Sequence, residues 1–337
     1  MKKRRVLVLL HKDLIPPDTV PKGYDIENAS WKTEYHVIQA LKKLGHEVRV
    51  TGILGDLNPI RTSIHEFNPH IVFNLLEEFD GEAVYDQNVV SYLELLKTPY
   101  TGANPRGLIL ARDKSLTKKI LSYHRVPAPS FLVFPRNRST RIKEVRFPQI
   151  VKCLNEEASM GISQASVVNS LEKLKDRVHY LHKTFQVDAI SEDFIEGSEY
   201  YVGVLGNYAL KTLPVWELKF EKSDAPKKEI YSEKAKFSDK YRNRKGIRTG
   251  PAELSELEIK EISNLAKRTY KALGLSGYAR IDFRRGTDSK FYVLEANPNP
   301  DIAYDDEFAM SAQHAGISYA DLISKILKLG LDWSKGP

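Results

Sequence analysis

The apolar residues in the first third of the chain fall into short runs separated by stretches with helical periodicity. Val6 to Leu10 is an uninterrupted aliphatic run of the kind found in parallel strands buried on both faces. Further strands are expected over 46–53 and 70–76, and apolar residues recur at helical spacing over 31–44 and 84–97. This alternation predicts a small doubly wound α/β unit with a parallel sheet.

The rest of the chain loses this alternation. Strands are expected at 131–134, 149–153, 187–194, 199–205 and 213–220, and helices at 113–123, 170–183 and 255–273. The segments "GYARIDFRR" (277–285) and "KFYVLEAN" (290–297) predict a hairpin. The stretch 221–248 is highly charged and almost without aliphatic residues, which favours a mobile lid.

These patterns predict an α/β fold in three domains. The expected domains are an N-terminal α/β domain (1–105), a central domain (106–205) and a C-terminal domain (206–330) that includes the lid.

Composition places the chain among ordinary soluble globular proteins. Of its 337 residues 42% are hydrophobic, and the five apolar residues after Arg5 are too few for a signal peptide or a membrane span. We therefore expect a cytoplasmic protein with no membrane partner. The single cysteine, Cys153, excludes an internal disulfide and a Cys-rich metal site. The net charge of +7 is scattered, which argues against nucleic-acid binding and is equally explained by an anionic small molecule such as a nucleotide.

The predicted C-terminal hairpin carries a set of oxygen ligands. Side chains alternate along a strand, so Val293, Glu295 and Asn297 are expected on one face, and suitable pairing would bring Asp282 to the last two. Two carboxylates and an amide, without histidine or thiol, are typical ligands of Mg²⁺ beside phosphates. The alternative is a pair of solvated acids and an asparagine in a turn.

Three lysines are candidates for binding phosphate. Lys152 lies in the otherwise apolar strand "PQIVKCL", where an inward-facing charge is costly unless it is paired. Lys114 at the start of a helix and Lys236 in the charged stretch complete a candidate trio, although each alone is equally a surface lysine.

The segment "ISEDFIEGSEYYV" predicts a nucleotide slot. Glu192 and Glu199 flank Phe194 and Ile195, so an adenine would lie in an apolar slot with one acid for its exocyclic amine and the other for ribose hydroxyls.

Taken together, the motifs resemble the ATP-grasp superfamily and, within it, the D-alanine–D-alanine ligase-like branch. The resemblance is carried in order by "PYTGANPRGLILARDKSLTKKIL" (99–121), "IVKCLNEEASMGIS" (150–163), "SEDFIEGSEYYVGVL" (191–205), "GYARIDFRRGTDSKFYVLEANPNP" (277–300) and "AGISYADLISKIL" (315–327). It implies an N-terminal doubly wound sheet followed by two ATP-grasp subdomains that sandwich ATP. It also implies small-molecule substrates and, commonly, a homodimer.

The resemblance assigns roles to individual residues. The phosphates would be held by Lys114, Lys152, Lys236 and a loop containing Glu156, Ser159 and Gly161. Glu192 would bind the adenine amine in the slot of Phe194 and Ile195, and Glu199 would bind the ribose. Asp282, Glu295 and Asn297 would bind two Mg²⁺ ions, or Mn²⁺, and Arg280, with Lys236 and Ser159, would contact the reacting oxygens. Family members phosphorylate a carboxylate with ATP, and an amine then attacks the acyl phosphate, releasing phosphate and leaving ADP.

The chain departs from the family on the substrate side. Asp301 replaces a glycine, Asp306 lies near the position of a serine that helps bind the acceptor's carboxylate, and Glu77 replaces a histidine. The family's amine-binding glutamate is missing, and Glu34 on the first helix is a candidate replacement. We therefore expect an ADP-forming carboxylate–amine ligase whose substrates are not two D-alanines, with an acceptor richer in amine than in acid.

Several alternatives to this hypothesis stay open. They are an authentic D-alanine–D-alanine ligase, a small-molecule kinase with the same ATP site, a catalytically silent ATP-binding subunit, and acids that form only a solvated loop face.

Overall fold

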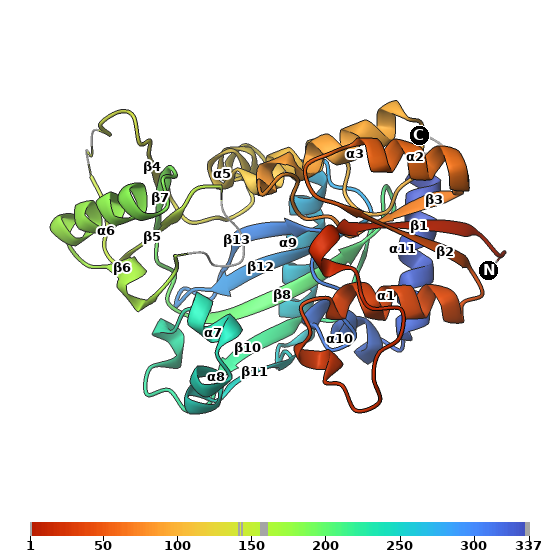
Figure 1. Ribbon diagram of the computed structural model, residues 1–337. Coiled ribbons are helices and arrows are strands. Elements are labelled where there is room, and N and C mark those ends of the chain that lie inside the picture. Colours follow the sequence, from red (N-terminus) through yellow and green to blue (C-terminus); the bar gives the residue numbers. More distant parts are fainter. Residues whose placement is uncertain (1, 141, 143, 156–160, 334–337) are drawn as a thin grey trace.

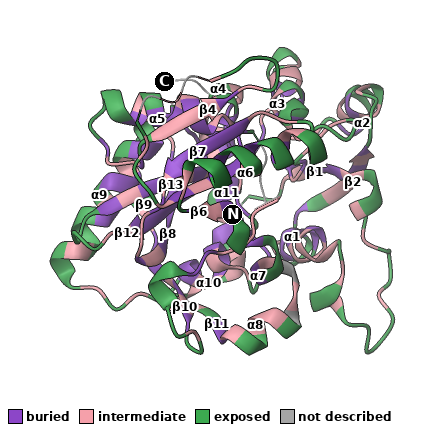
Figure 2. Ribbon diagram, turned by 90° about the vertical axis from the view of Figure 1, so that its left-hand side faces the viewer, coloured by how far each residue is buried: buried purple, intermediate pink, exposed green. Residues whose placement is uncertain are grey.

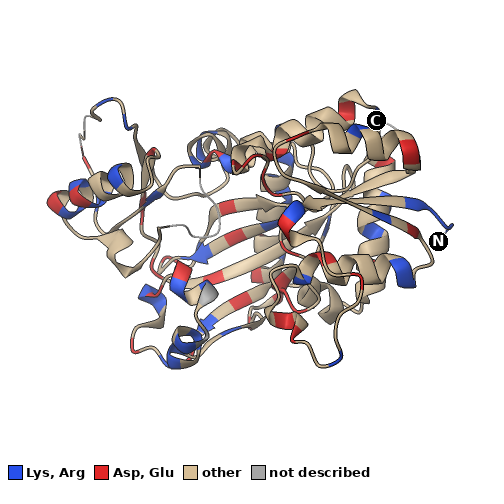
Figure 3. Cartoon of the chain, in the orientation of Figure 1, with Lys and Arg blue, Asp and Glu red and all other residues tan. Residues whose placement is uncertain are grey.

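The computed structural model describes residues 2–140, 142, 144–155 and 161–333. Its strands form three sheets, which follow one another across Figure 1: a parallel sheet near the N-terminus, a six-stranded sheet in the middle and a four-stranded sheet at the far end. In the described ranges no helix has the length and apolar character needed to cross a membrane. Basic and acidic residues are interspersed along most elements (Figure 3).

The N-terminal sheet is parallel and covered on both faces. Its elements are β1 (Arg5–His11), α1 (Lys32–Lys43), β2 (Glu47–Ile53), α2 (Asn58–Phe67), β3 (Ile71–Asn74) and α3 (Asp86–Leu95), with strand order β2-β1-β3. Val6 and Val8 of β1 pack in a cluster with α1, whereas Leu7 and Leu9 pack with α2 and α3. The predicted doubly wound unit is confirmed, with one helix, α2, that the sequence pattern did not show.

The last helix of the chain returns to this first sheet. Helix α11 (Tyr319–Trp333) buries Leu322 and Ile326 in the same cluster as Val6 and Val8, on the side covered by α1 (Figure 1). The sequence grouped this helix with the C-terminal domain, because periodicity identifies an apolar face but not the surface that it covers.

The central sheet is antiparallel, with order β4-β7-β5-β6. This region contains α4 (Pro105–Arg112), α5 (Lys114–Tyr123), β4 (Phe131–Phe134), β5 (Gln149–Cys153), β6 (Val167–Val168), α6 (Leu171–Thr184) and β7 (Ala189–Asp193). Asp113 caps α5 by accepting hydrogen bonds from the backbone of Ser115 and Leu116. This cap makes Lys114 the first residue of the helix. Helices α3 and α6 expose their outer faces (Figure 2).

The six-stranded sheet is the largest, with order β11-β10-β8-β12-β13 and β9 paired to β8. Its elements are β8 (Ser198–Leu205), β9 (Lys211–Thr212), β10 (Trp216–Phe220), β11 (Ile247–Pro251), α9 (Glu256–Ala272), β12 (Tyr278–Arg285), β13 (Phe291–Pro298) and α10 (Glu307–His314). The sequence analysis placed β8 in the central domain, but β8 pairs with β10 and β12. Strand pairing is a long-range contact that sequence order does not reveal. The three-domain division itself stays a prediction.

The charged stretch 221–248 connects β10 to β11 and is partly helical. It contains η5 (Pro226–Lys228), α7 (Glu233–Phe237) and α8 (Asp239–Lys245). The other short 3₁₀ turns are η1 (Lys12–Leu14), η2 (Ile26–Asn28), η3 (Ala83–Tyr85) and η4 (Gln164–Ser166). We refer to 221–248 as the lid.

Candidate active site

The pairing of β12 with β13 brings together the oxygen ligands expected from the sequence. Asp282 lies directly opposite Glu295, and Arg280 lies opposite Asn297. Asn297 donates a hydrogen bond from Nδ2 to Asp282 at 2.9 Å. The two carboxylates and the amide therefore share one face at one end of the hairpin.

A β-bulge corrects the alternation predicted for β13. The sequence placed Val293 on the face of Glu295, but the pairing shifts after Asp282, so that Phe283 lies opposite Val293. Both Phe283 and Val293 are fully buried in the hydrophobic core, whereas Glu295 lines a cavity together with Leu294. A bulge inserts one extra residue and inverts the alternation beyond it.

Arg280 holds the carboxylate of Asp282 in a bidentate pair. Its Nε and Nη2 donate to the two carboxylate oxygens at 2.8 and 3.0 Å. Burial raises the pKa of Asp282 to about 6, although the guanidinium of Arg280 opposes the shift.

The carboxylate of Glu295 lies among positive charges. Burial alone would raise its pKa, but nearby cations bring the pKa to about 2. Those cations are Lys114, Lys152, Lys236 and Arg280. The three lysines that the sequence singled out in separate segments thus act on one carboxylate.

The donor set of Asp282, Glu295 and Asn297 fits a hard divalent cation. The third donor of this set is the amide of Asn297. Among the described residues no group of three or more His, Cys, Asp or Glu is placed to hold a metal ion. Carboxylate and amide oxygens suit Mg²⁺ or Mn²⁺ better than Zn²⁺. Glu295 stays ionised at neutral pH, as such a ligand must.

Two buried lysines hold Glu192. Its carboxylate lies 3.2 Å from Nζ of Lys118 and 3.1 Å from Nζ of Lys152, and Glu192 is only 1% exposed. Burial would raise the pKa of Glu192, but the two lysines lower it below its ordinary value. Oε1 of Glu192 still has no hydrogen-bond partner among the described residues, although it faces Lys152 as an ion pair.

Lys118 was not identified from the sequence. It donates to the backbone carbonyl of Leu294 at 3.2 Å and so ties α5 to the strand that carries Glu295. It lies four residues after Lys114 and hence on the same helix face, which is the signal that would have found it.

The predicted nucleotide slot lines a cavity between the central and six-stranded sheets. Glu192, Phe194, Ile195 and Glu199 all face this cavity, whose further lining includes Ile150, Lys152, Ile162, Ile230, Leu294 and Glu295. The apolar walls and the few acids are the composition of a ligand pocket.

Arg284 is a second residue whose role the sequence did not show. Its guanidinium is buried, donates to the carbonyl of Ile195 at 3.0 Å and lies 3.4 Å from Glu199. It also donates to the carbonyl of Glu229 in the lid and lies 5.0 Å from the ring centroid of Phe194. Arg284 therefore joins the slot to the lid.

The phosphate-covering loop is partly outside the described residues, and Glu156 and Ser159 lie there. Gly161 is described, with a φ of +68° at which a Cβ would lie 2.9 Å from the ring of Phe185. Both the conformation and the close ring favour glycine at this position.

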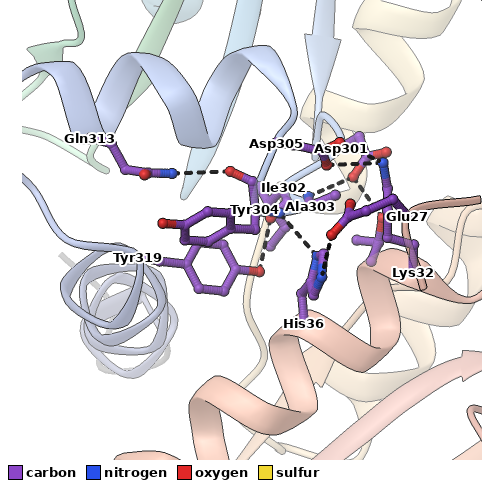
Figure 4. A network of polar contacts seen from close by, with 11 residues as sticks. Glu27, Lys32, His36, Asp301, Ile302, Ala303, Tyr304, Asp305, Gln313 and Tyr319 are labelled. Carbon is purple, nitrogen blue, oxygen red and sulfur yellow. Dashed lines mark hydrogen bonds and ion pairs between the residues drawn. The ribbon is translucent and has the colours of Figure 1, made fainter. Parts of the chain in front are cut away.

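Two of the acids after β13, Asp301 and Asp305, are held by α1. Asp301 accepts hydrogen bonds from Oγ1 of Thr33 and from the backbone N–H of Ala303, both at 2.8 Å. Asp305 lies 2.9 Å from Nζ of Lys32 (Figure 4). These bonds fix the positions of Asp301 and Asp305, and both acids still line the catalytic cavity described next.

Two adjoining cavities lie on either side of this segment. The catalytic cavity is lined by Arg280, Asn297 and Lys236 and also by Glu77, Asp86, Asp301, Asp305, Asp306, Glu307, Lys32, Arg112 and Arg242, so that both signs of charge are present. The acidic cavity is lined by Glu34, Glu77, Glu78 and Asp301, with His11 and Asn74 at the strand ends.

Asp306 is a buried acid of the catalytic cavity. Its Oδ1 has no hydrogen-bond partner among the described residues, and burial, together with Glu307 and Asp301, raises its pKa well above the ordinary value. Glu307 lies 3.6 Å from Arg280.

The fold and this site define an ATP-grasp ligase, in which two antiparallel sheets enclose a cavity lined by carboxylates, Lys152 and apolar side chains. The chain belongs to the D-alanine–D-alanine ligase family, because residues 122–328 match the family model described as D-ala D-ala ligase C-terminus. It is therefore an ATP-dependent enzyme that joins a carboxylate to an amine and forms ADP.

Individual relatives agree with this assignment. A D-alanine–D-alanine ligase of Aquifex aeolicus is 32% identical over 88% of this chain and 94% of its own length, and an uncharacterized protein, y4sG, of Sinorhizobium fredii is 29% identical over 93% and 89%. A crystal structure of the D-alanine–D-alanine ligase of Bacillus anthracis complexed with ATP has a TM-score of 0.75 at 22% identity, covering 98% of this chain and 99% of that one. At this identity the structure shows the shared fold alone.

Proposed function

We propose that the enzyme activates its carboxylate substrate as an acyl phosphate, that it couples an amine to it, and that the two substrates are not both D-alanine. The observation that carries the proposal is the convergence of Lys114, Lys152 and Lys236 on Glu295, opposite Asp282. Phosphoryl transfer needs positioning and charge neutralisation more than covalent help, and this set supplies both.

The nucleotide is proposed to bind between the central and six-stranded sheets. Its adenine would lie against Phe194 and Ile195, with the amino group donating to Oε1 of Glu192, the buried oxygen left without a hydrogen bond. Glu199 would receive the ribose hydroxyls. The ATP complex of the Bacillus anthracis enzyme supports the choice of nucleotide.

Two Mg²⁺ ions, or Mn²⁺ in their place, are proposed as the metal cofactor, held by Asp282, Glu295 and Asn297. When bound, the ions supply charge neutralisation for the phosphates. The ammonium groups of Lys114 and Lys152 orient the phosphate chain from the central domain, and Lys236 approaches it from the lid.

The reaction then proceeds in two displacements. A carboxylate oxygen attacks the γ-phosphorus and ADP leaves; the neutral amine next attacks the acyl carbon and inorganic phosphate leaves. Arg280 is placed to stabilise the oxyanion of the second step. The lid over the catalytic cavity would exclude water from the acyl phosphate, which hydrolyses readily.

Substrates other than a D-alanine pair are supported by the acids around the reaction site. Asp306, with an unpartnered Oδ1, lies near the position where the family places a serine for the acceptor's carboxylate. The carboxylate of Asp306 at this position would repel the carboxylate of an acceptor amino acid. Five cationic side chains nearly offset the six acids of this cavity, so the larger excess of acid lies in the adjoining acidic cavity.

A screen of paired carboxylates and amines tests the proposal, with ADP, phosphate and product mass measured together. We expect ADP and free phosphate in equal amounts and an amide product. ADP release with D-alanine alone would establish the activity named for the Aquifex aeolicus relative, which is the second candidate. A phosphorylated product without free phosphate would establish a kinase, and ATP binding without turnover a silent subunit.

A further inference from the structure

The acidic cavity has walls of one charge sign. It lies at the carboxyl ends of β1 and β3, below the first turn of α1 and beside the turn that follows β13. Its lining contains four carboxylates, Glu34, Glu77, Glu78 and Asp301, and among the described lining residues there is no lysine or arginine. The adjoining catalytic cavity, by contrast, contains five cationic side chains.

Glu77 has a polar interaction of its own, and two of the other acids have partners that explain their presence. Glu78 lies 3.3 Å from Nε2 of His11. Asp301 accepts from Thr33 and Ala303 as described above. These two acids are therefore parts of the local structure.

Glu34 differs from those acids. Its residue is only 5% exposed, and among the described residues its carboxylate has its own backbone N–H as a hydrogen-bond donor but no side-chain donor or cation. Burial raises the pKa of Glu34 to about 7; the hydrogen bond from its own backbone N–H opposes the shift and the charge of Asp301 adds to it. An isolated carboxylate in a buried position is costly to the folded protein unless a ligand compensates it.

The fold places Glu34 firmly. The residues before it on α1, Lys32 and Thr33, bind Asp305 and Asp301 respectively, and the ring of His36 accepts from the backbone N–H of Tyr304 at 3.1 Å. Figure 4 shows these bonds crossing from α1 to the segment after β13. Glu34 thus lies on a helix turn whose neighbouring residues are hydrogen-bonded to the segment after β13.

The acidic and catalytic cavities adjoin each other. Both are lined by Leu76, Glu77, Asn299, Pro300 and Asp301. A substrate whose reacting group lies beside Arg280 and that is long enough to pass Asn299 would therefore reach the acidic cavity.

We infer that one substrate of the enzyme carries a protonated amine separated from its reacting group by a short carbon chain, and that this amine binds Glu34 in the acidic cavity. The inference rests on the proposed ligase function and specifies its substrate class. An ammonium group supplies the hydrogen-bond donors and the positive charge that Glu34 lacks.

Matched pairs of ligands test this inference without turnover. Calorimetry of the full chain, saturated with a non-hydrolysable ATP analogue and Mg²⁺, compares lysine with norleucine and 6-aminohexanoate with hexanoate, with both enantiomers of each amino acid. Each pair differs in the terminal amine alone. We expect the amine-bearing member to bind about tenfold or more tightly.

Variants of Glu34 identify the residue responsible. In Glu34→Gln the preference for the amine-bearing ligand should fall to about twofold or less, while affinity for the ATP analogue is unchanged, and Glu34→Asp should restore part of the preference. Glu47→Gln, an exposed position on β2, serves as the matched control. Equal binding of lysine and norleucine, absence of binding by every amine-bearing probe, or a preference that survives in Glu34→Gln would overturn the inference. Failure of the ligase proposal would instead appear as ATP binding without ADP release in the substrate screen.

Discussion

Asp282 and Glu295 face each other across the β12–β13 pair, yet their pKa values move in opposite directions. Burial raises the pKa of Asp282 to about 6 although Arg280 opposes it, whereas for Glu295 the surrounding lysines overcome burial and lower the pKa to about 2. Two carboxylates on one sheet face thus lose their protons in different pH ranges, because only Glu295 lies among the lysines.

Replacement of Glu295 tests the proposed metal and phosphate site. Glu295→Gln removes the negative charge that the three lysines surround, so we expect ATP turnover to fall by at least about 100-fold while the circular dichroism spectrum is retained. Glu253→Gln, at an exposed carboxylate paired with Lys219, is the control. Near-normal ADP release by Glu295→Gln would exclude the assignment.

Removal of Lys118 tests its part in holding Glu192. Lys118→Met leaves the buried carboxylate with Lys152 alone and breaks the bond to the carbonyl of Leu294. Loss of one partner of a buried ion pair costs about 3 kcal/mol or more. We expect that decrease in the free energy of unfolding, measured with urea, and weaker ATP binding.

Lys119→Met provides the matched control for this experiment, because Lys119 is the next residue on α5 and is exposed. Equal stability of the two variants would show that the Lys118–Glu192 pair contributes nothing net.

Substitution of Arg284 tests the connection between slot and lid. Arg284→Lys keeps a charge but cannot reach the carbonyls of Ile195 and Glu229 together with Glu199. We expect the Kd for an ATP analogue to rise about tenfold and trypsin to cleave the lid faster in the presence of nucleotide. Arg248→Lys, at an exposed position on β11, should change neither measurement.

Protonation of Glu34 should make stability depend on pH. Its pKa rises from 4.5 to about 7 on folding, so the folded state holds the proton more tightly. The stability this gives is fully present below pH 4.5 and is lost as the pH rises through 7. The shift corresponds to about 3 kcal/mol as an upper bound.

Glu34→Gln cannot titrate and should escape this loss. We expect the variant to gain stability relative to the parent protein between pH 5 and 8 in urea unfolding, with no gain for Glu47→Gln. A constant difference between parent and variant across this range would show that Glu34 ionises in the folded protein as it does in the unfolded chain.

Much of the architecture could be predicted from local patterns. The buried run of β1, the helices at α1 and α6 and the C-terminal hairpin follow from periodicity and turn residues, which short segments express by themselves. The metal-ligand types at Asp282, Glu295 and Asn297 could also be predicted, because hard oxygen donors at a strand end indicate binding of a divalent cation such as Mg²⁺.

The sequence by itself determined the order of elements, the family and the kinds of side chain available to ATP and metal. The tertiary structure alone decided which of them meet. A β-bulge places Val293 in the core, and Lys118 forms an ion pair with Glu192. Arg284 donates a hydrogen bond to the lid, and Thr33 donates one to Asp301. These relationships join residues distant in the chain, and their energies depend on burial and distance, which exist only after the sheets have assembled.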